Sequence, residues 1–311
     1  MQIICLKIFN CDTHKRKLIF IMNGILNILK PTGMSSHDVV SFVRKSIGIK
    51  KVGHAGTLDP NVAGVLPICV GKATKFSDIL INGDKEYICE IKFGQSTDTQ
   101  DMYGNVVEEL KDFEFNEQEA IKVINSFRGT IFQIPPAYSA VKFNGKKLYE
   151  YARQDIIIEK EARQAEIKSL EILKINNPNV LIKVKCSKGT YMRTLCHDIG
   201  IKLGIPAHMG ILIRTEAKGL KIENSLSLED LSFFAQMNRI ANCMISVDDI
   251  VPMEKIIVNE KYYDKLIVGN EVYCKTSADL SDDFYVYCKD MLIGIGHVVD
   301  EKHIKINKML I

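Results

Sequence analysis

The segment from Lys85 to Phe93 alternates between apolar and polar side chains, and this two-residue period constrains the fold more than any other feature of the sequence. In an extended chain Tyr87, Cys89, Ile91 and Phe93 point to one side, while most of the residues between them are charged. This is the pattern of a β-strand in a sheet that buries one face. A chain built around such a strand needs helices or a second sheet to cover that face.

Helical segments interleave with the predicted strands as far as about residue 250. Ser35-Ser36 offers a helix cap, and Val39, Val40, Val43 and Ile47 then share one helical face. Further helices are predicted over 117–128, from Thr190 onward and after Ser227, and strands over Gly24–Leu29, Val65–Val70, Tyr138–Phe143, Ile167–Ile175 and Val180–Cys186. The mixed order and the hairpin turns predict an α+β fold, in which a mixed, largely antiparallel sheet is flanked by helices.

The pattern changes near residue 250 to short β-rich runs such as Glu271–Cys274 and Phe284–Cys288. We therefore predict one α+β domain over residues 22–250 and a small β-rich domain over residues 251–311. Residues 1–21 precede a second methionine and the first well-patterned segment. We expect them to be an N-terminal extension outside the fold.

The sequence contains no run of the ~18 apolar residues that a membrane span needs. Its nine cysteines include no Cys-x-x-Cys pair, so neither a zinc ribbon nor a thioredoxin-type site is supported. Reduced thiols in a cytoplasmic protein are the simplest interpretation. We also expect no contact with a membrane.

Positive charge is concentrated in three segments, although the whole chain carries a net charge of only +3. Residues 22–75, 138–153 and 183–218 each contain more Lys and Arg than Asp and Glu, and aromatic residues lie among them. A basic face with interleaved aromatic rings is typical of a protein that binds nucleic acid. Lysines that only solvate exposed faces produce the same pattern, so charge alone leaves both interpretations open.

Residues 53–60, Gly-His-Ala-Gly-Thr-Leu-Asp-Pro, place one carboxylate on a shaped loop beside a predicted buried strand. Gly53 and Gly56 allow a tight backbone, and Pro60 favours an extended conformation at Asp59. A carboxylate held in this way can be a nucleophile, a general base or a metal ligand. Asp-Pro is also a common way to begin a turn.

Two other kinds of site are not supported near this loop. The spacing from Gly64 to Gly71-Lys72 is longer than in a phosphate-binding loop, and Ala73 stands where a magnesium-binding Ser or Thr is needed. No second His or Cys stands at ligand spacing near His54, so we expect no metal.

Five short motifs follow one another between about residues 24 and 215, and together they are far more specific than any one alone. They are Leu29–Ser36; Gly53–Pro60 continued by Ala63–Pro67 and Gly71–Lys75; Lys85-x-Tyr87 with Gly94–Thr99; Pro135–Lys142 with Gly145–Arg153; and Cys186–Thr194. In this order they resemble the motifs of the TruB family of tRNA pseudouridine synthases, in its bacterial, stand-alone branch.

The resemblance implies the pseudouridine synthase fold and the activity of that family. The enzyme would flip uridine 55 of the tRNA T loop out of its stack and isomerise it to pseudouridine, with no cofactor and no metal. Asp59 would be the nucleophile, attacking either C6 of the uracil or C1′ of the ribose. Tyr87 would stack on the uracil and assist removal of the C5 proton, and Arg193 would pair with Asp59. The family positions that hold the flipped nucleotide correspond to His54, Tyr191 and Leu212.

Elementary electrostatics agrees with these roles. A nucleophilic carboxylate must stay ionised in a pocket dry enough to stack a base, and a nearby guanidinium favours the ionised form. Arg193, expected near the start of a helix, supplies that charge. Ile213 departs from the family, whose members often have a second arginine there. The region after residue 250 occupies the place of a small RNA-binding β-barrel of the PUA kind.

The expected partner is therefore tRNA, bound through its T stem-loop by a monomer that needs no guide RNA. One alternative is a tRNA-binding folding helper in which catalysis is incidental. Another is a nucleotide-dependent phosphotransferase built on Gly64–Lys72. The variant Asp59→Asn separates the isomerase from the folding helper, since a folding helper would keep its activity.

Overall fold

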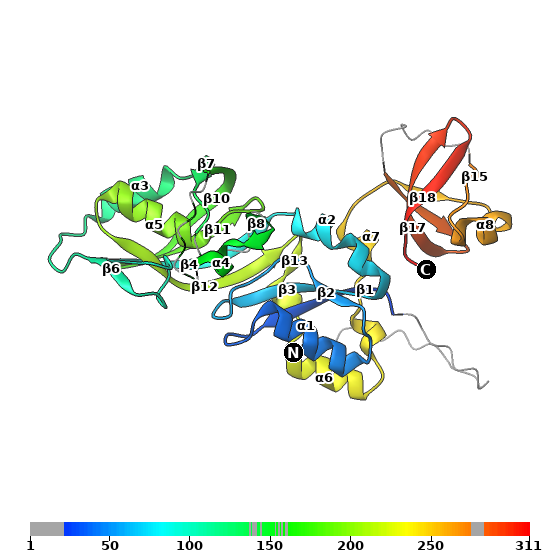
Figure 1. Ribbon diagram of the computed structural model, residues 1–311, viewed down its shortest axis with the longest axis horizontal. Helices are drawn as coiled ribbons and strands as arrows, with labels where there is room; N and C mark the ends of the chain where they lie inside the picture. The colour runs from blue at the N-terminus through cyan, green and yellow to red at the C-terminus, as the bar shows by residue number, and fades with distance from the viewer. Residues whose placement is uncertain are drawn as a thin grey trace.

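The computed structural model describes residues 22–136, 138, 142–143, 145–152, 154, 156, 158, 161–274 and 283–311. The largest part of the structure is a long sheet with helices packed on it, and a second sheet lies at one end of the molecule (Figure 1). The described strands of the large sheet follow the spatial order β1-β3-β12-β4-β11-β10-β7, with β2 paired to β3 and β13 paired to β12. Their bounds are β1 Gly24–Lys30, β2 Val52–His54, β3 Ala63–Val70, β4 Lys85–Phe93, β7 Gly129–Gln133, β10 Arg163–Asn176, β11 Asn179–Cys186, β12 Ala207–Ala217 and β13 Leu220–Lys221.

The pairings in this sheet are antiparallel except the one between β12 and β3, which is parallel. The mixed, largely antiparallel sheet that the sequence predicts is therefore confirmed. β4 spans the residues whose alternation predicted it and lies between β12 and β11. Its apolar residues Cys89, Ile91 and Phe93 are buried.

Two pairs of helices cover the sheet at its two ends (Figure 1). α1 (Ser36–Ile47) lies beside α6 (Leu228–Gln236), and α3 (Glu117–Asn125) lies beside α5 (Met192–Leu203). α1 and α6 are capped by Ser35 and Ser227, where the sequence predicts caps. Each serine hydroxyl accepts a hydrogen bond from the backbone amide of the aspartate three residues on, and the serine backbone amide donates to that aspartate's carboxylate.

Short elements complete this part of the fold. They are α2 Ser77–Ile81, α4 Leu148–Ala152, α7 Val247–Ile250, the hairpin of β5 Gln95–Thr97 with β6 Val106–Glu109, and the hairpin of β8 Lys142–Phe143 with β9 Lys146–Lys147.

β3 is buried on both faces, which accounts for its unbroken apolar sequence. Leu66 and Ile68 pack in a cluster with residues of α1 and α6. Val65 and Cys69 pack in a second cluster, which includes side chains of the C-terminal sheet. The strand that leads out of the Asp59 loop is therefore fixed from both sides.

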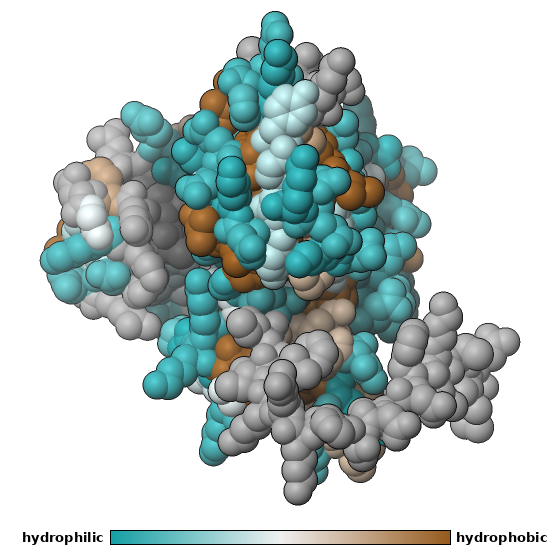
Figure 2. Space-filling model, turned by 90° about the vertical axis from the view of Figure 1, so that its right-hand side faces the viewer, coloured by the Kyte–Doolittle hydropathy of each residue, from teal (hydrophilic) through white to brown (hydrophobic). Residues whose placement is uncertain are grey.

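A five-stranded sheet of order β14-β16-β17-β18-β15 lies in the C-terminal part of the chain. Its elements are β14 Lys255–Ile257, α8 Tyr263–Ile267, β15 Val272–Tyr273, β16 Phe284–Cys288, β17 Met291–Asp300 and β18 His303–Met309. Tyr285 and Ile295 pack in one cluster with Ile25 and Phe76 of the large domain. Seen from this end, the visible surface consists mostly of hydrophilic side chains (Figure 2). The β-rich character expected after residue 250 is thus confirmed.

Several element boundaries differ from those predicted; the strand predicted over Ile167–Ile175, for example, runs from Arg163 to Asn176. The helix predicted over 117–128 ends at Asn125. The helix predicted from Thr190 begins at Met192, because the Thr190 hydroxyl donates to the Ser187 carbonyl (2.9 Å) and Tyr191 is still extended.

The strand predicted over Tyr138–Phe143 is also wrong at its start, since Tyr138 lies in a bend and the described strand is Lys142–Phe143. Residues 139–141, and residues 1–21 with the predicted extension, lie outside the described residues. Throughout the described part of the chain, no helix is long and apolar enough to cross a bilayer.

Candidate active site

The loop between β2 and β3 carries Asp59 and is held by buried side chains on both sides of that residue. The Ser36 hydroxyl donates to the Leu58 carbonyl (3.0 Å) and accepts from the Leu58 amide (2.9 Å). The Lys30 ammonium donates to the Pro60 carbonyl (3.0 Å). Lys30 and Ser36 are both buried, so water does not compete for these hydrogen bonds. The backbone on either side of Asp59 is therefore fixed.

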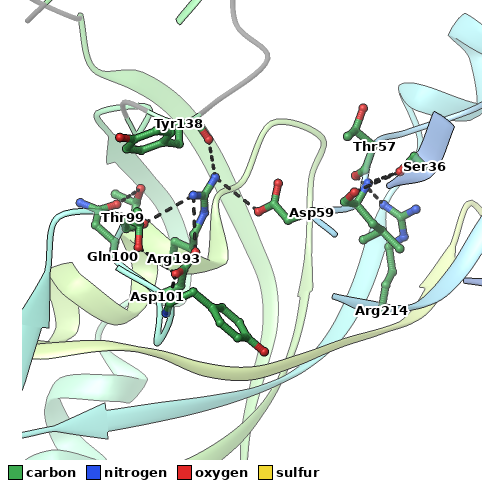
Figure 3. A network of polar contacts seen from close by, with 12 residues as sticks. Ser36, Thr57, Asp59, Thr99, Gln100, Asp101, Tyr138, Arg193 and Arg214 are labelled. Atoms are coloured by element: carbon green, nitrogen blue, oxygen red, sulfur yellow. Dashed lines mark hydrogen bonds and ion pairs between the residues drawn. The ribbon is translucent and has the colours of Figure 1, made fainter. Parts of the chain in front are cut away.

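Arg193 lies in the first turn of α5, and its guanidinium points toward the Asp59 carboxylate (Figure 3). Nη2 lies 3.4 Å from Oδ2 of Asp59, and Nη1 lies 3.7 Å from Oδ2 of Asp101. Nη2 also donates to the Tyr138 carbonyl (2.7 Å). The Arg193 side chain is 9% exposed, whereas that of Asp59 is 47% exposed. A cation is unfavourable at a helix N-terminus, so the two carboxylates stabilise Arg193 there.

Tyr87 lies on β4, directly opposite Arg214 of β12 in the strand register. It packs at the edge of the cluster formed with α5. Loss of contact with water raises the pKa of Tyr87, and the charge and hydrogen bonding of Arg214 oppose this shift. At neutral pH the residue therefore offers an apolar ring and a protonated hydroxyl.

One cavity of about 1180 Å³ brings together all the site residues singled out from the sequence. They come from β2, the following loop, β4, the start of α5 and β12: His54, Asp59, Tyr87, Tyr191, Arg193 and Leu212. The cavity is large enough for a nucleotide. The individual roles of these residues remain predictions.

Four further residues belong to the same site, although sequence reasoning did not assign them to it: Lys30, Ser36, Asp101 and Arg214. Lys30 and Arg214 are charged, yet they lie in strands and are 0% and 1% exposed. A charged residue at an inward-facing strand position is the one sequence signal that points to them.

Burial lowers the pKa of Lys30 to about 8, and the nearby Asp59 carboxylate opposes the shift. Burial also lowers the pKa of Lys85, on the cavity wall, to about 8. The Lys85 ammonium donates to the Gly83 carbonyl (2.6 Å). Two lysines at the site thus titrate near pH 8.

The basic segments expose less positive charge than the sequence indicates. Lys183 pairs with Glu86 (3.2 Å), and Lys185 pairs with Glu216 (3.4 Å). Lys30, Arg193 and Arg214 are buried. Part of the charge counted along the chain therefore supports the fold and the site, and the exposed lysines carry the remainder.

The phosphotransferase interpretation fails on geometry. Gly64 through Val70 lie inside β3, so no loop is present there to surround a phosphate. The Lys72 ammonium donates to the Ile311 carbonyl. Among the residues that the structure describes, no three His, Cys, Asp or Glu side chains are grouped so as to hold a metal ion.

Comparison with known proteins agrees with this arrangement. Residues 44–192 match the TruB family pseudouridylate synthase N-terminal domain, and residues 193–267 match the tRNA pseudouridylate synthase B C-terminal domain. The chain belongs to the TruB family of pseudouridylate synthases.

Its relatives include a protein of Clostridioides difficile (strain 630) named tRNA pseudouridine synthase B. That protein is 42% identical over 301 residues, which cover 93% of this chain and 100% of the relative. A protein of the same name from Caldanaerobacter subterraneus subsp. tengcongensis is 52% identical over 211 residues, which cover 68% of this chain and 74% of the relative.

Among solved structures, a crystal structure of a Cbf5-Nop10-Gar1 complex contains a similar chain. The TM-score is 0.70 and the sequence identity 26%, with 93% of this chain and 85% of that chain covered. This similarity supports the pseudouridine synthase fold.

Proposed function

We propose that this protein isomerises uridine 55 in the T loop of tRNA to pseudouridine, with Asp59 as the nucleophile. The observation that carries the proposal is the contact of Asp59 with Arg193, 3.4 Å apart, in the cavity that Tyr87 also lines. The name shared by the relatives, tRNA pseudouridine synthase B, supports tRNA as the substrate.

The reaction needs no external oxidant or reductant, because it rearranges one nucleotide. The N1–C1′ bond breaks and the C5–C1′ bond forms, while the proton on C5 is removed and N1, freed from the ribose, takes up a proton. The Asp59 carboxylate supplies the attacking electron pair, at C6 of the uracil or at C1′ of the ribose, and the bond it forms breaks again before the product leaves. Arg193 Nη2, 3.4 Å from Oδ2 of Asp59, orients the carboxylate toward the flipped base.

The remaining cavity residues receive the flipped nucleotide in this proposal. The Tyr87 ring stacks on the uracil, and its hydroxyl assists removal of the C5 proton. His54, Tyr191 and Leu212 hold the nucleotide around that stack. Because the base leaves a loop that is already partly unstacked, extrusion costs only a few kcal/mol.

The wider setting of the enzyme belongs to the same proposal. The domain over residues 251–311 acts as a PUA-like RNA-binding module beside the domain over residues 22–250. The protein works in the cytoplasm as a monomer, without a guide RNA.

The experiment is incubation of the full chain with an unmodified tRNA transcript, followed by mapping of pseudouridine at single-nucleotide resolution. A transcript with cytidine at position 55 is the matched substrate control. We expect one pseudouridine, at position 55, with no added metal or nucleotide. Binding of the transcript without any pseudouridine would refute the isomerase and favour the folding helper.

A further inference from the structure

Arg214 is a buried arginine beside the Asp59 loop, and none of the roles above uses it. It lies in β12 and is 1% exposed. Its Nε donates to the Val65 carbonyl (2.7 Å), Nη2 to the Gly56 carbonyl (3.1 Å) and Nη1 to the Thr57 carbonyl (3.4 Å). One planar guanidinium therefore joins the start of the loop to the strand that leaves it.

Close approach of the backbones brings Arg214 to this position. β12 and β3 are paired in parallel with Arg214 beside Gly64, and Gly64 has a φ of 123°. A Cβ at Gly64 would lie 2.2 Å from the Arg214 carbonyl oxygen. Only glycine permits this approach, which sets β12 against the strand that continues the Asp59 loop.

Arg214 also faces the other side of the site. Tyr87 is its register partner across β12 and β4, and side chains of directly opposed residues lie close together. Arg214 therefore bonds to the loop that bears Asp59 and also lies beside Tyr87. In Figure 3 it lies on the opposite side of Asp59 from Arg193.

The pairing of this charge is unusual for a residue that only stabilises a fold. Among the described residues, Arg214 donates to backbone carbonyls, its hydrogen bonding also acts on Tyr87, and it has no ion pair within 4.0 Å. A buried charge without a counter-ion is costly, and arginine does not relieve the cost by losing its proton. An apolar side chain would leave the Val65, Gly56 and Thr57 carbonyls without this donor. The guanidinium is thus committed to the loop that carries Asp59, which points to a role in the site.

We propose that Arg214 is a positioning residue for the isomerisation: its guanidinium clamps the carbonyls of Gly56 and Thr57 and so sets the Asp59 carboxylate relative to Tyr87. This inference rests on the proposed function. Arg214 lies on the cavity wall, but its guanidinium is held by the Val65, Thr57 and Gly56 carbonyls, so it acts through the loop and through its strand partner. Its contribution appears in the chemical step and leaves the affinity for tRNA unchanged.

The test uses two variants of the full chain and one matched control. Arg214→Gln removes the charge and keeps one donor group, whereas Arg214→Lys keeps the charge and replaces the planar fork with a single ammonium. The control is Arg44→Gln, because Arg44 also donates to a backbone carbonyl, that of Val52 at the start of β2 (2.7 Å). Melting temperature, tRNA affinity and single-turnover rate at saturating tRNA are measured well below each melting temperature.

We expect both Arg214 variants to bind tRNA as the wild type does and to lose about 100-fold in single-turnover rate, the loss typical of a 1 Å displacement of a reacting group. Arg44→Gln should keep the wild-type rate whatever its melting temperature. Arg214 variants with rates within about threefold of wild type would overturn the proposal.

Equal rate losses in the control and in the Arg214 variants would also overturn it, as would failure of both Arg214 variants to fold, since Arg214 would then serve stability alone. An inactive wild-type protein would instead refute the proposed function. The two failures are therefore distinguishable.

Discussion

Removing only the hydroxyl of Tyr87 separates a catalytic role from a packing role. The ring lines the cavity and packs at the edge of the α5 cluster, so Tyr87→Phe preserves both contacts. The hydroxyl faces the positive charge of Arg214, which lowers the pKa of Tyr87 against the larger effect of burial. A hydroxyl in that environment is placed to take part in a proton transfer.

The expected effects on stability and on chemistry differ in size. Loss of one hydrogen bond to a charged partner destabilises by about 1.5–3 kcal/mol at most, and Arg214 keeps three backbone carbonyls. We therefore expect a shift of a few degrees in melting temperature, at most about 8 °C. Loss of a positioned proton-transfer group lowers the rate by about 100-fold or more.

The assay compares single-turnover isomerisation and tRNA affinity in three variants. Tyr103→Phe is the matched control, because Tyr103 lines the same cavity but is 60% exposed. It should behave as wild type. Tyr87→Leu should show the same loss of single-turnover rate as Tyr87→Phe. It should also capture the flipped base less well, since a stacked base contributes ~1–3 kcal/mol.

A fully active Tyr87→Phe enzyme would refute this reasoning. If Tyr87 were only a core residue, the phenylalanine variant would be nearly silent in chemistry. The leucine variant would then act mainly by lowering the melting temperature.

Three other predictions concern Arg193, the exposed basic residues and Lys85. Arg193→Lys should lower the single-turnover rate by about 100-fold with unchanged tRNA affinity, because one ammonium cannot hold Asp59 and Asp101 together; equal losses in rate and affinity would contradict this. The slope of log K for tRNA against log salt should be about −0.7 to −0.9 for each phosphate contacted, and a slope near zero would contradict the exposed basic surface. Lys85 has a folded pKa of about 8 against 10.5 unfolded, so its contribution to stability is full above pH 10.5 and is lost as pH falls through 8. It amounts to about 3 kcal/mol over that interval. The free energy of unfolding, measured by denaturant between pH 8 and 9.5, should therefore rise more steeply in wild type than in Lys85→Met, and parallel slopes would refute the assignment.

The elements with strong local signals were predictable from the sequence. The period of residues 85–93 defined β4, and the serine caps defined the starts of α1 and α6. The start of α5 was predicted too early, because the Thr190 hydroxyl bonds to Ser187 instead of capping the helix. Such a choice between two local partners is not visible in the residue types.

The site was predictable where its residues lie in recognisable motifs, as Asp59, Tyr87 and Arg193 do. Lys30 and Arg214 were not assigned to it, because their partners are backbone carbonyls, which every residue carries. Only the fold shows which carbonyls they reach. Asp101 was also missed, since its contact with Arg193 depends on how the loop after β5 turns back toward α5.

The most direct test of the central claim compares Asp59→Asn with wild type on one tRNA transcript. Asparagine keeps the shape of the side chain and removes the carboxylate that attacks the nucleotide. We expect tRNA affinity to stay near the wild-type value and pseudouridine at position 55 to disappear. Residual turnover within about tenfold of wild type, a loss far smaller than removal of a nucleophile produces, would contradict the assignment of Asp59 as the nucleophile.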